Sequence, residues 1–430
     1  MGKWAVFGAA MVLAGSMSTG IAGAAPMTCA ESTWVGSWMA APSDSLSAAD
    51  PSLVPQLSIS DQTYRVVITP HRGGSELRVH LTNRTRPIAM DIGHVTVAHR
   101  TVGAAVRPDS VREVTFGGAR AVRIPPWSDV VSDPVQLDFE AFAALAVSVH
   151  APGLAVLPTE HFNGNATSYY SLPFAGDRTA DPAGAQLPLS TTAVPFVSGL
   201  DVRAPGEVSA IVAFGDSITD GYVSATFLGT PQDGGVIDQN VRYPDFLQRR
   251  LDAAGKPFSV LNAGISGNRV TRDGFIPQFG PNAGARLQAD VIDKAGVGDV
   301  IVLEGINDLG IPIGAGYDEV VAGYTGLIQR LHAAGLRVHL GTILPTSNAL
   351  LDGMITLPYA NPVRQRINAW IRTQRLSDSV VDFDAALRDP ANPDVLDPRY
   401  AGPDNLHPNA AGYRAMAEAI DLDRFTPSCG

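Results

Sequence analysis

Two short segments, far apart in the chain, carry residue types that could together attack an ester. The first is 215–218 (Gly-Asp-Ser-Ile), which follows the apolar run 208–214, and the second is 404–407 (Asp-Asn-Leu-His) near the C-terminus. A continuous apolar run predicts a buried parallel strand, and open α/β sheets place ligands at the carboxyl ends of such strands. Ser217 would lie there. A serine hydroxyl needs an adjacent base, and His407, with Asp404 three residues earlier, is the natural candidate.

Two further segments lie between these in the sequence. Residues 262–268 (Asn-Ala-Gly-Ile-Ser-Gly-Asn) follow the apolar run 258–261, and residues 305–308 (Gly-Ile-Asn-Asp) follow the run 300–303. Both segments therefore also follow predicted strands, and they contain glycines and an asparagine that can donate hydrogen bonds to a developing oxyanion.

The order of these four segments resembles that of the SGNH hydrolases, the GDSL esterase/lipase family, over roughly residues 209–425. Ile218 stands where the family name has leucine, a change that keeps a similar apolar volume. The resemblance implies a flavodoxin-like three-layer α/β/α domain with a parallel sheet. It also implies that Ser217 is the nucleophile, that His407 acts as general base and then acid, and that Asp404 orients His407.

The same resemblance implies an oxyanion hole made of the backbone N–H groups of Ser217 and Gly267 and the side-chain amide of Asn307. Gly264 is the competing glycine, interpreted as part of a tight turn. Asp216 and Asp308 are interpreted as supporting or turn-forming residues.

Structural alternatives exist for the two central residues. Ser217 could cap a helix, and His407 could be a structural histidine at a helix start. All four segments occur in the expected order, which favours catalysis. No His/Cys pair has metal-ligand spacing and no glycine-rich phosphate loop occurs, so neither a metal nor a cofactor is expected.

The region before the catalytic segments predicts an all-β domain over 33–182. Short alternating strands are expected at 77–81, 94–98, 121–124 and 145–149, with turn residues between them, which favours a sandwich or jelly roll. This region resembles the N-terminal β region of a subgroup of secreted SGNH esterases. Residues 183–207, rich in Pro, Ala, Gly and Thr, are predicted to connect it to the catalytic domain at 208–430.

Within 208–430, helical periodicity is expected at 243–254, 319–334 and 410–420, and strands at 338–344 and 380–383. Such alternation of strands and helices predicts a parallel, doubly wound sheet.

Both ends of the chain suggest export. Residues 1–24 have the features of a signal peptide: Lys3, the apolar stretch 4–13 and small residues at 22–24. A membrane anchor is the alternative, but this stretch is too short to cross about 30 Å of bilayer. Cys29 and Cys429 are the two cysteines, and a disulfide between them is expected in an exported protein, with two free thiols as the alternative.

A formal net charge of −11 argues against a nucleic-acid or anionic-membrane partner. The sequence therefore predicts a secreted, monomeric serine esterase that acts on a small-molecule or glycan ester, such as an acetylated carbohydrate or a short-chain acyl ester. Two alternatives stay open: a lipase or lysophospholipase acting on longer acyl chains, and a carbohydrate-binding protein with a vestigial hydrolase domain.

Overall fold

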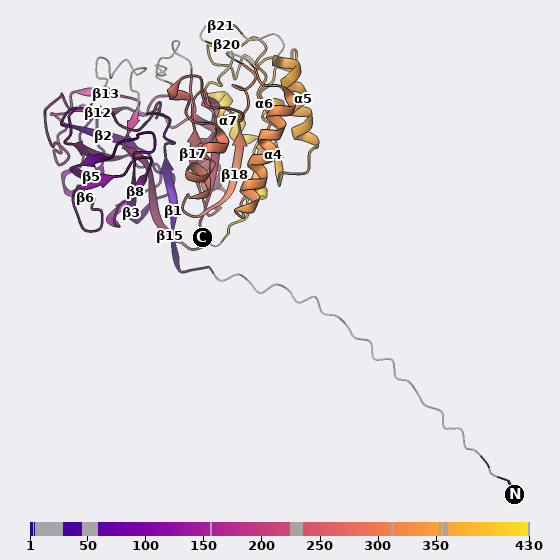
Figure 1. The fold of residues 1–430 in the computed structure, drawn as a ribbon, viewed down its shortest axis with the longest axis horizontal. Helices are drawn as coiled ribbons and strands as arrows, with labels where there is room; N and C mark the ends of the chain where they lie inside the picture. The colour runs from indigo at the N-terminus through magenta and orange to yellow at the C-terminus, as the bar shows by residue number, and fades with distance from the viewer. Residues whose placement is uncertain are drawn as a thin grey trace.

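The computed structural model describes residues 1, 2, 4, 29–44, 59–154, 157–223, 235–310, 314–351, 354–355 and 360–428. Figure 1 shows two parts side by side, one made of strands and the other of strands and helices. The predicted signal peptide lies almost entirely outside the described residues. Among the helices that are described, none combines the length and the apolar composition needed to cross a bilayer.

The N-terminal part contains two antiparallel sheets. The first has the strand order β1-β15-β3-β8, with β9 also paired to β3, and the second has the order β13-β12-β2-β10-β5-β6. The strands of the first sheet are β1 (Ser32–Met39), β3 (Gly74–Thr82), β8 (Asp129–Val131), β9 (Val135–Phe139) and β15 (Val197–Pro205). Those of the second are β2 (Gln62–Ile68), β5 (His94–His99), β6 (Arg112–Glu113), β10 (Leu145–Ala151), β12 (Ser168–Tyr170) and β13 (Leu189–Thr191).

Two short pairs complete this β domain. They are β4 (Met90–Ile92) with β7 (Val122–Ile124), and β11 (Glu160–His161) with β14 (Val194–Pro195). Apolar residues of both large sheets, among them Val79 of β3 and Val147 of β10, belong to one buried cluster. Alternation along β3 buries Leu77, Val79 and Leu81, as the period of two predicts for a strand with one face in the core. The all-β expectation is confirmed.

The predicted connection over 183–207 is wrong. β15 pairs with β1 on one side and β3 on the other, so it lies inside the first sheet. Its buried Leu200, Val202 and Ala204 are separated by Asp201 and Arg203, but this pattern begins only after a stretch rich in Pro, Ala, Gly and Thr. Asp201 is also buried, because Arg78 and His80 of β3 pair with its carboxylate. The chain therefore returns through the β domain immediately before it enters the second domain.

The C-terminal part contains a five-stranded parallel sheet in the order β17-β16-β18-β19-β22. Numbered within this domain the order is 2-1-3-4-5, which is the flavodoxin-like arrangement. The strands are β16 (Ser209–Gly215), β17 (Phe258–Gly264), β18 (Val297–Leu303), β19 (Arg337–Gly341) and β22 (Ser379–Val381). A separate small pair joins β20 (Leu350–Leu351) and β21 (Met354–Ile355).

Helices cover both faces of the parallel sheet. They are α1 (Ser217–Asp220), α2 (Tyr243–Ala253), α3 (Ala283–Leu287), α4 (Tyr317–Ala333), α5 (Ala360–Thr373), α6 (Phe383–Leu387) and α7 (Ala410–Glu418). Ile211 and Ala213 of β16 pack in the cluster that contains residues of α1, α2, α6 and α7. Val212 and Phe214 pack in the cluster with α3, α4 and α5. This is the predicted three-layer α/β/α architecture.

The two parts share a core. β1 of the β domain lies against β17 of the parallel sheet. Gly36 permits a close approach at this contact, because a Cβ there would lie 2.6 Å from a methyl carbon of Leu261. Val35 and Trp38 belong to the same buried cluster as Leu261. The β domain is therefore packed onto the hydrolase domain by apolar contacts.

Candidate active site

Three adjacent strands end at the same level of the parallel sheet. Gly215, the last residue of β16, pairs with Gly264 at the end of β17 and with Leu303 at the end of β18. The segments that follow these three strands therefore begin side by side. They are the segments that carry Ser217, Gly267 and Asn307.

The chain turns sharply between β16 and Ser217. A Cβ on Gly215 would lie 2.1 Å from the Thr219 hydroxyl and 2.4 Å from the carbonyl oxygen of Leu303, so only glycine fits at the end of this strand. Asp216 caps the helix, because its carboxylate accepts a hydrogen bond from the N–H of Ile218 at 3.0 Å. Ser217 is thus the first residue of α1 and lies above the carboxyl edge of the sheet.

The structure brings Ser217, His407 and Asp404 together. His407 Nε2 lies 2.8 Å from Ser217 Oγ, and His407 Nδ1 lies 2.6 Å from Asp404 Oδ2. Because an ionised carboxylate only accepts hydrogen bonds, Nδ1 carries the proton and Nε2 is left to accept the proton of the serine hydroxyl. This is the arrangement of a serine nucleophile, its base and the acid that orients the base.

Asp404 is held in its ionised form. Burial alone would raise the pKa of its carboxyl group, but the charge and hydrogen bond of His407 and two backbone N–H donors lower that pKa below its ordinary value. These donors are the N–H groups of Leu406 and His407, each 3.0 Å from Asp404 Oδ1. The ring of Tyr222 packs against the imidazole of His407, with their centroids 4.8 Å apart.

Gly267 and Asn307 follow β17 and β18, the strands on either side of β16. Gly267 has φ +77, and a Cβ there would overlap the ring of Phe279 at 2.2 Å, so the position accepts only glycine. Its N–H has no acceptor among the described residues. Asn307 Nδ2 donates one hydrogen bond to the carbonyl oxygen of Asn268 at 2.9 Å, which fixes the amide and leaves its second N–H for a ligand.

Gly264, the competing glycine, has a different task. Its N–H donates to the side-chain oxygen of Asn262 at 2.9 Å and is therefore occupied. A Cβ on Gly264 would lie 2.2 Å from the backbone nitrogen of Asp220, so Gly264 allows β17 and α1 to approach each other closely. This geometry favours Gly267 as the oxyanion donor.

Asp308 shapes the loop after β17. Its carboxylate accepts hydrogen bonds from the N–H groups of Val270 and Thr271 and from the Thr271 hydroxyl, at 2.7–2.9 Å. Asp308 therefore ties the segment after β18 to the segment that carries Gly267, in agreement with the supporting role expected for it.

Arg286 of α3 was not predicted as a site residue, although it organises the layer beneath the site. Its guanidinium is buried and donates to the carbonyl oxygens of Gly215 and Ala263 and to the carboxylate of Glu304. Arginine on a helix is exposed in most proteins, so its position in the sequence carried no signal.

Two acids near Arg286 have strongly raised pKa values. Burial raises the pKa of Asp216 to about 7, and the neighbouring Asp308 carboxylate adds to that effect. Burial and the nearby Asp216 also raise the pKa of Glu304 well above its ordinary value. Buried acids that repel each other in this way favour their protonated forms over two negative charges.

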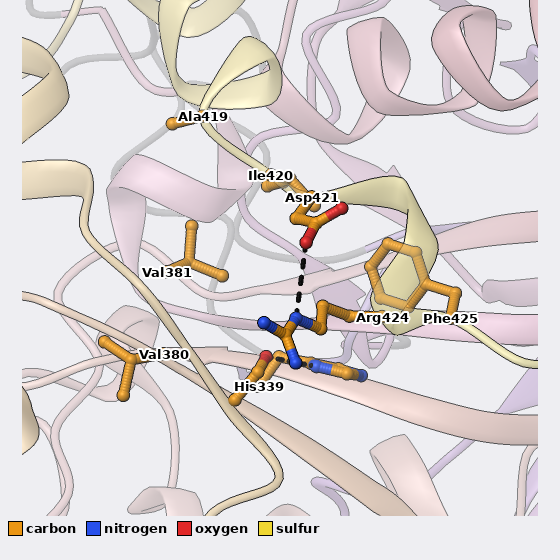
Figure 2. A pocket seen from close by; sticks show the side chains of 9 residues that line it. His339, Val380, Val381, Ala419, Ile420, Asp421, Arg424 and Phe425 are labelled. Carbon is orange, nitrogen blue, oxygen red and sulfur yellow. Dashed lines mark hydrogen bonds and ion pairs between the residues drawn. The ribbon is translucent and has the colours of Figure 1, made fainter.

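A cavity of about 110 Å³ lies away from these residues. Figure 2 shows its lining, which comes from β19, β22 and the C-terminal residues 419–425 and includes His339 and Arg424. None of Ser217, Asp404 and His407 lines it. Within the described ranges, no group of three or more His, Cys, Asp or Glu side chains is placed to hold a metal ion.

Comparisons with known proteins agree with this geometry. The model of the GDSL-like lipase/acylhydrolase family matches residues 213–415, which include Ser217, Gly267, Asn307, Asp404 and His407. No curated protein matches the chain.

Several solved structures resemble about half of this chain. They include an aryl esterase from M. smegmatis (18% identity, 49% of this chain and 96% of that one, TM-score 0.38). A carbohydrate acetylesterase from Sinorhizobium meliloti has 15% identity over 49% of this chain and 96% of that one, with a TM-score of 0.38. A GDSL-like lipase from Bacteroides thetaiotaomicron has 20% identity over 50% and 87%, with a TM-score of 0.34.

These structural likenesses are too distant to carry an argument about this chain, so the assignment rests on the family model, the order of the strands and the placement of the four segments. By these criteria residues 213–415 form a domain of the GDSL-like lipase/acylhydrolase family, the SGNH hydrolases, and this domain is a carboxylic ester hydrolase.

Proposed function

We propose that this protein is a secreted serine esterase that hydrolyses acetyl or other short-chain esters through an acyl-enzyme on Ser217. The observation that carries the proposal is the continuous hydrogen-bonded series from Ser217 Oγ through His407 to Asp404. An intact series of this kind also argues against a purely carbohydrate-binding protein with a vestigial hydrolase domain.

Acylation begins at the serine. Ser217 Oγ attacks the ester carbonyl carbon while His407 Nε2 takes the hydroxyl proton, and Asp404 stabilises the imidazolium that forms. The carbonyl oxygen becomes an oxyanion, which accepts hydrogen bonds from the N–H groups of Ser217 and Gly267 and from the amide of Asn307. The tetrahedral intermediate then collapses, His407 returns the proton to the departing alkoxide, and the alcohol leaves.

Deacylation repeats these steps with water as the nucleophile. His407 removes a proton from water, the resulting hydroxide attacks the acyl carbonyl carbon, and the same donors hold the second oxyanion. Collapse of this intermediate breaks the bond to Ser217 Oγ, which regains its proton from His407, and the carboxylic acid is released.

The low solvent exposure of the two reacting side chains supports a small acyl group. Ser217 and His407 are each only 6% exposed. Aromatic residues make up 7% of the chain, a modest content for a protein that would bind a lipid surface. These features favour an acetylated carbohydrate or short-chain acyl ester over the lipid esters of a lipase or lysophospholipase.

Export and the Cys29–Cys429 disulfide belong to the same proposal. Cys429 lies outside the described residues, but the neighbours of both cysteines lie against one short segment, 206–209. The carbonyl oxygen of Ala30 packs on Gly206, and Ser428 exchanges hydrogen bonds with the Ser209 hydroxyl. The two ends of the mature chain therefore approach each other, as a bridge requires.

Hydrolysis of p-nitrophenyl esters from acetate to palmitate, together with release of acetate from acetylated xylan, tests the proposal. We expect the acetate and butyrate esters to have the highest kcat/KM and the Ser217→Ala variant to be inactive on every ester. A preference for palmitate would favour the lipase alternative. Binding of glycans without hydrolysis of any ester would favour the carbohydrate-binding alternative.

A further inference from the structure

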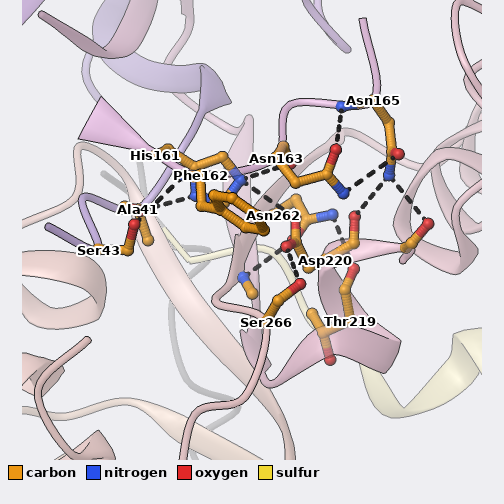
Figure 3. Close-up of polar contacts among 12 residues, drawn as sticks. Ala41, Ser43, His161, Phe162, Asn163, Asn165, Thr219, Asp220, Asn262 and Ser266 are labelled. Atoms are coloured by element: carbon orange, nitrogen blue, oxygen red, sulfur yellow. Dashed lines mark hydrogen bonds and ion pairs between the residues drawn. The ribbon is translucent and has the colours of Figure 1, made fainter. Parts of the chain in front are cut away.

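A loop of the β domain reaches the helix that carries the nucleophile. Figure 3 shows this loop, which begins at His161, the last residue of β11, and runs to Asn165, beside Asp220 and Ser266 of the hydrolase domain. Asp220 is the last residue of α1, and Ser217 is the first. The loop therefore contacts the catalytic helix at its C-terminal end, one turn after the nucleophile.

His161 makes the central contact. Its Nδ1 lies 2.8 Å from the carbonyl oxygen of Ala41, and its Nε2 lies 2.7 Å from the carbonyl oxygen of Asn163 and 3.1 Å from Asp220 Oδ1. All three partners are acceptors. Both ring nitrogens must therefore carry a proton for these contacts to be hydrogen bonds, which makes His161 an imidazolium ion paired with the carboxylate of Asp220.

Burial makes this ion pair unusual. His161 is 5% exposed and Asp220 is 2% exposed. Burial alone would lower the pKa of His161, but the Asp220 carboxylate and the two carbonyl acceptors raise it above its ordinary value. Removal of either partner would leave an uncompensated buried charge.

Asp220 also contacts the loop after β17, which carries Ser266 and Gly267 and is called the oxyanion loop below. Its second carboxylate oxygen, Oδ2, accepts a hydrogen bond from Ser266 Oγ at 2.7 Å. Ser266 directly precedes Gly267, whose N–H is a proposed oxyanion donor. His161, Asp220 and Ser266 therefore form one chain of polar contacts that connects the β domain to both α1 and the loop after β17.

Asn165 supports the same end of α1. Its amide donates to the carbonyl oxygens of Asp220 and Gly221, at 3.2 and 2.9 Å. Carbonyl groups at the C-terminal end of a helix have no partner within the helix, so the β domain adds donors at an end that Gly221 terminates in the left-handed conformation. Asn163 in turn accepts the N–H of Asn165 and fixes the loop.

We propose that His161 is a positioning residue for ester hydrolysis: as an imidazolium ion it fixes Asp220 and, through Ser266, holds the Ser217 helix and the Gly267 N–H in register. This inference rests on the proposed role of Ser217 and Gly267. The β domain would then contribute to the reaction, because the His161 imidazolium belongs to the β domain and not to the hydrolase domain.

The first test is His161→Gln. Glutamine is of similar size but carries no charge, and it presents an oxygen where His161 presents one of its N–H groups. A displaced oxyanion donor weakens transition-state binding more than substrate binding, so we expect kcat to fall about tenfold or more while KM changes by less than about twofold. Retained kcat in a folded variant would overturn the proposal.

His71→Gln is the matched control. His71 is also a buried histidine of the β domain that contacts the hydrolase domain, with a carboxylate, Asp245, at 2.9 Å and the carbonyl oxygen of Val260 at 2.6 Å. These partners belong to α2 and to the middle of β17, not to α1 or the oxyanion loop. We expect both variants to lower Tm and only His161→Gln to lower kcat. Equal losses of kcat would mean that loosening of the interface, and not positioning, explains the effect.

Ser266→Ala removes the last contact of the chain with a smaller change. We expect its loss of kcat not to add to that of His161→Gln in a double-mutant cycle, because both act through Asp220. Additive losses would contradict the connection through Asp220.

¹⁵N NMR of the wild-type protein tests the charge of the His161 imidazole even if His161→Gln does not fold. We expect both His161 ring nitrogens to be protonated at neutral pH, and one bare ring nitrogen would overturn the assignment. The proposed function fails separately, since active Ser217→Ala would refute the nucleophile without changing the NMR result.

Discussion

His407 Nε2 lies within 2.8 Å of Ser217 Oγ, although 190 positions of sequence separate the two residues. The contact exists because Ser217 follows the central strand β16, while His407 lies on the loop immediately before α7, which packs with α2 over the same face of the sheet. Asp404 is fixed on that loop by its own hydrogen bonds to the backbone N–H groups of Leu406 and His407.

Ser217→Ala should lower kcat at least about 10³-fold without unfolding the protein, because nucleophile and base act as a unit. Steady-state hydrolysis of p-nitrophenyl acetate measures the loss. Ser259→Ala is the matched control: Ser259 is a buried serine of the neighbouring strand β17 whose hydroxyl has no hydrogen-bond partner among the described residues. A Ser217→Ala variant as active as Ser259→Ala would refute the nucleophile.

Asp404→Asn should lower kcat about 10³–10⁴-fold, because an amide can present its N–H to His407 and favour the tautomer whose Nε2 cannot accept the serine proton. Asp397→Asn serves as control. Asp397 is also buried and lies on the same loop region, but its carboxylate pairs with Arg399. If both variants keep most of the wild-type kcat, Asp404 has no part in orienting His407.

Asn307→Ala should lower kcat by about 10²–10³ with little change in KM, since its free N–H would meet charge that develops only in the transition state. Asn307→Asp is a second test of the same donor, because the carboxylate has nearly the same shape as the amide and cannot donate a hydrogen bond when ionised. A raised KM with normal kcat in both variants would instead identify Asn307 as a substrate-binding residue.

Asp216→Asn should change how stability depends on pH. Burial raises the folded-state pKa of Asp216 from 3.8 to about 7, so between these values the folded protein binds one more proton than the unfolded chain. The free energy of unfolding should therefore fall as pH rises through this window, by up to about 1.4 kcal/mol per pH unit.

Asparagine still caps α1 but cannot ionise, so the variant should lose that slope. Urea unfolding between about pH 5 and about pH 8 measures it. Asp318→Asn, at an exposed carboxylate of α4, should keep the wild-type profile. Parallel profiles for wild type and Asp216→Asn would show that Asp216 does not hold a proton in the folded state.

The exported protein should contain a Cys29–Cys429 disulfide that serves stability and not chemistry. Intact mass before and after alkylation should reveal no free thiol without reduction. Cys29→Ser with Cys429→Ser should lower Tm, with about 5–6 kcal/mol as the upper bound of the chain-entropy model, and should keep activity within about threefold. Alkylation of the non-reduced protein would rule out the bridge.

Local sequence patterns were sufficient to predict most elements of the hydrolase domain. Apolar runs predicted β16, β17 and β18, and helical periodicity predicted α2, α4 and α7 to within a few residues. Such patterns work because a strand buried on both faces requires a continuous apolar run, and an amphipathic helix requires apolar residues at a period of about 3.6. The spacing of Asp404 and His407 could be interpreted in the same way, because both lie on one short loop.

One strand of the β domain could not be recognised from the composition of its sequence. The region 183–207, which contains β15, is rich in Pro, Ala, Gly and Thr and was therefore predicted to be a connection. Only pairing with β1 and β3 places β15 within a sheet. Strand assignment of this kind depends on partners that are more than a hundred residues away, and no local pattern encodes them.

The sequence by itself determined which residues could react: Ser217, Asp404, His407, Gly267 and Asn307, in segments whose order and strand context identify the family. The tertiary structure decided which groups surround them. Arg286 and His161 are buried charged residues whose partners come from distant segments, and Gly264 is excluded as a donor only by its bond to Asn262. A charge is stable inside a protein only when folding brings its counter-charge and hydrogen-bond acceptors to it. No local stretch of the sequence predicts which distant residues will meet that condition.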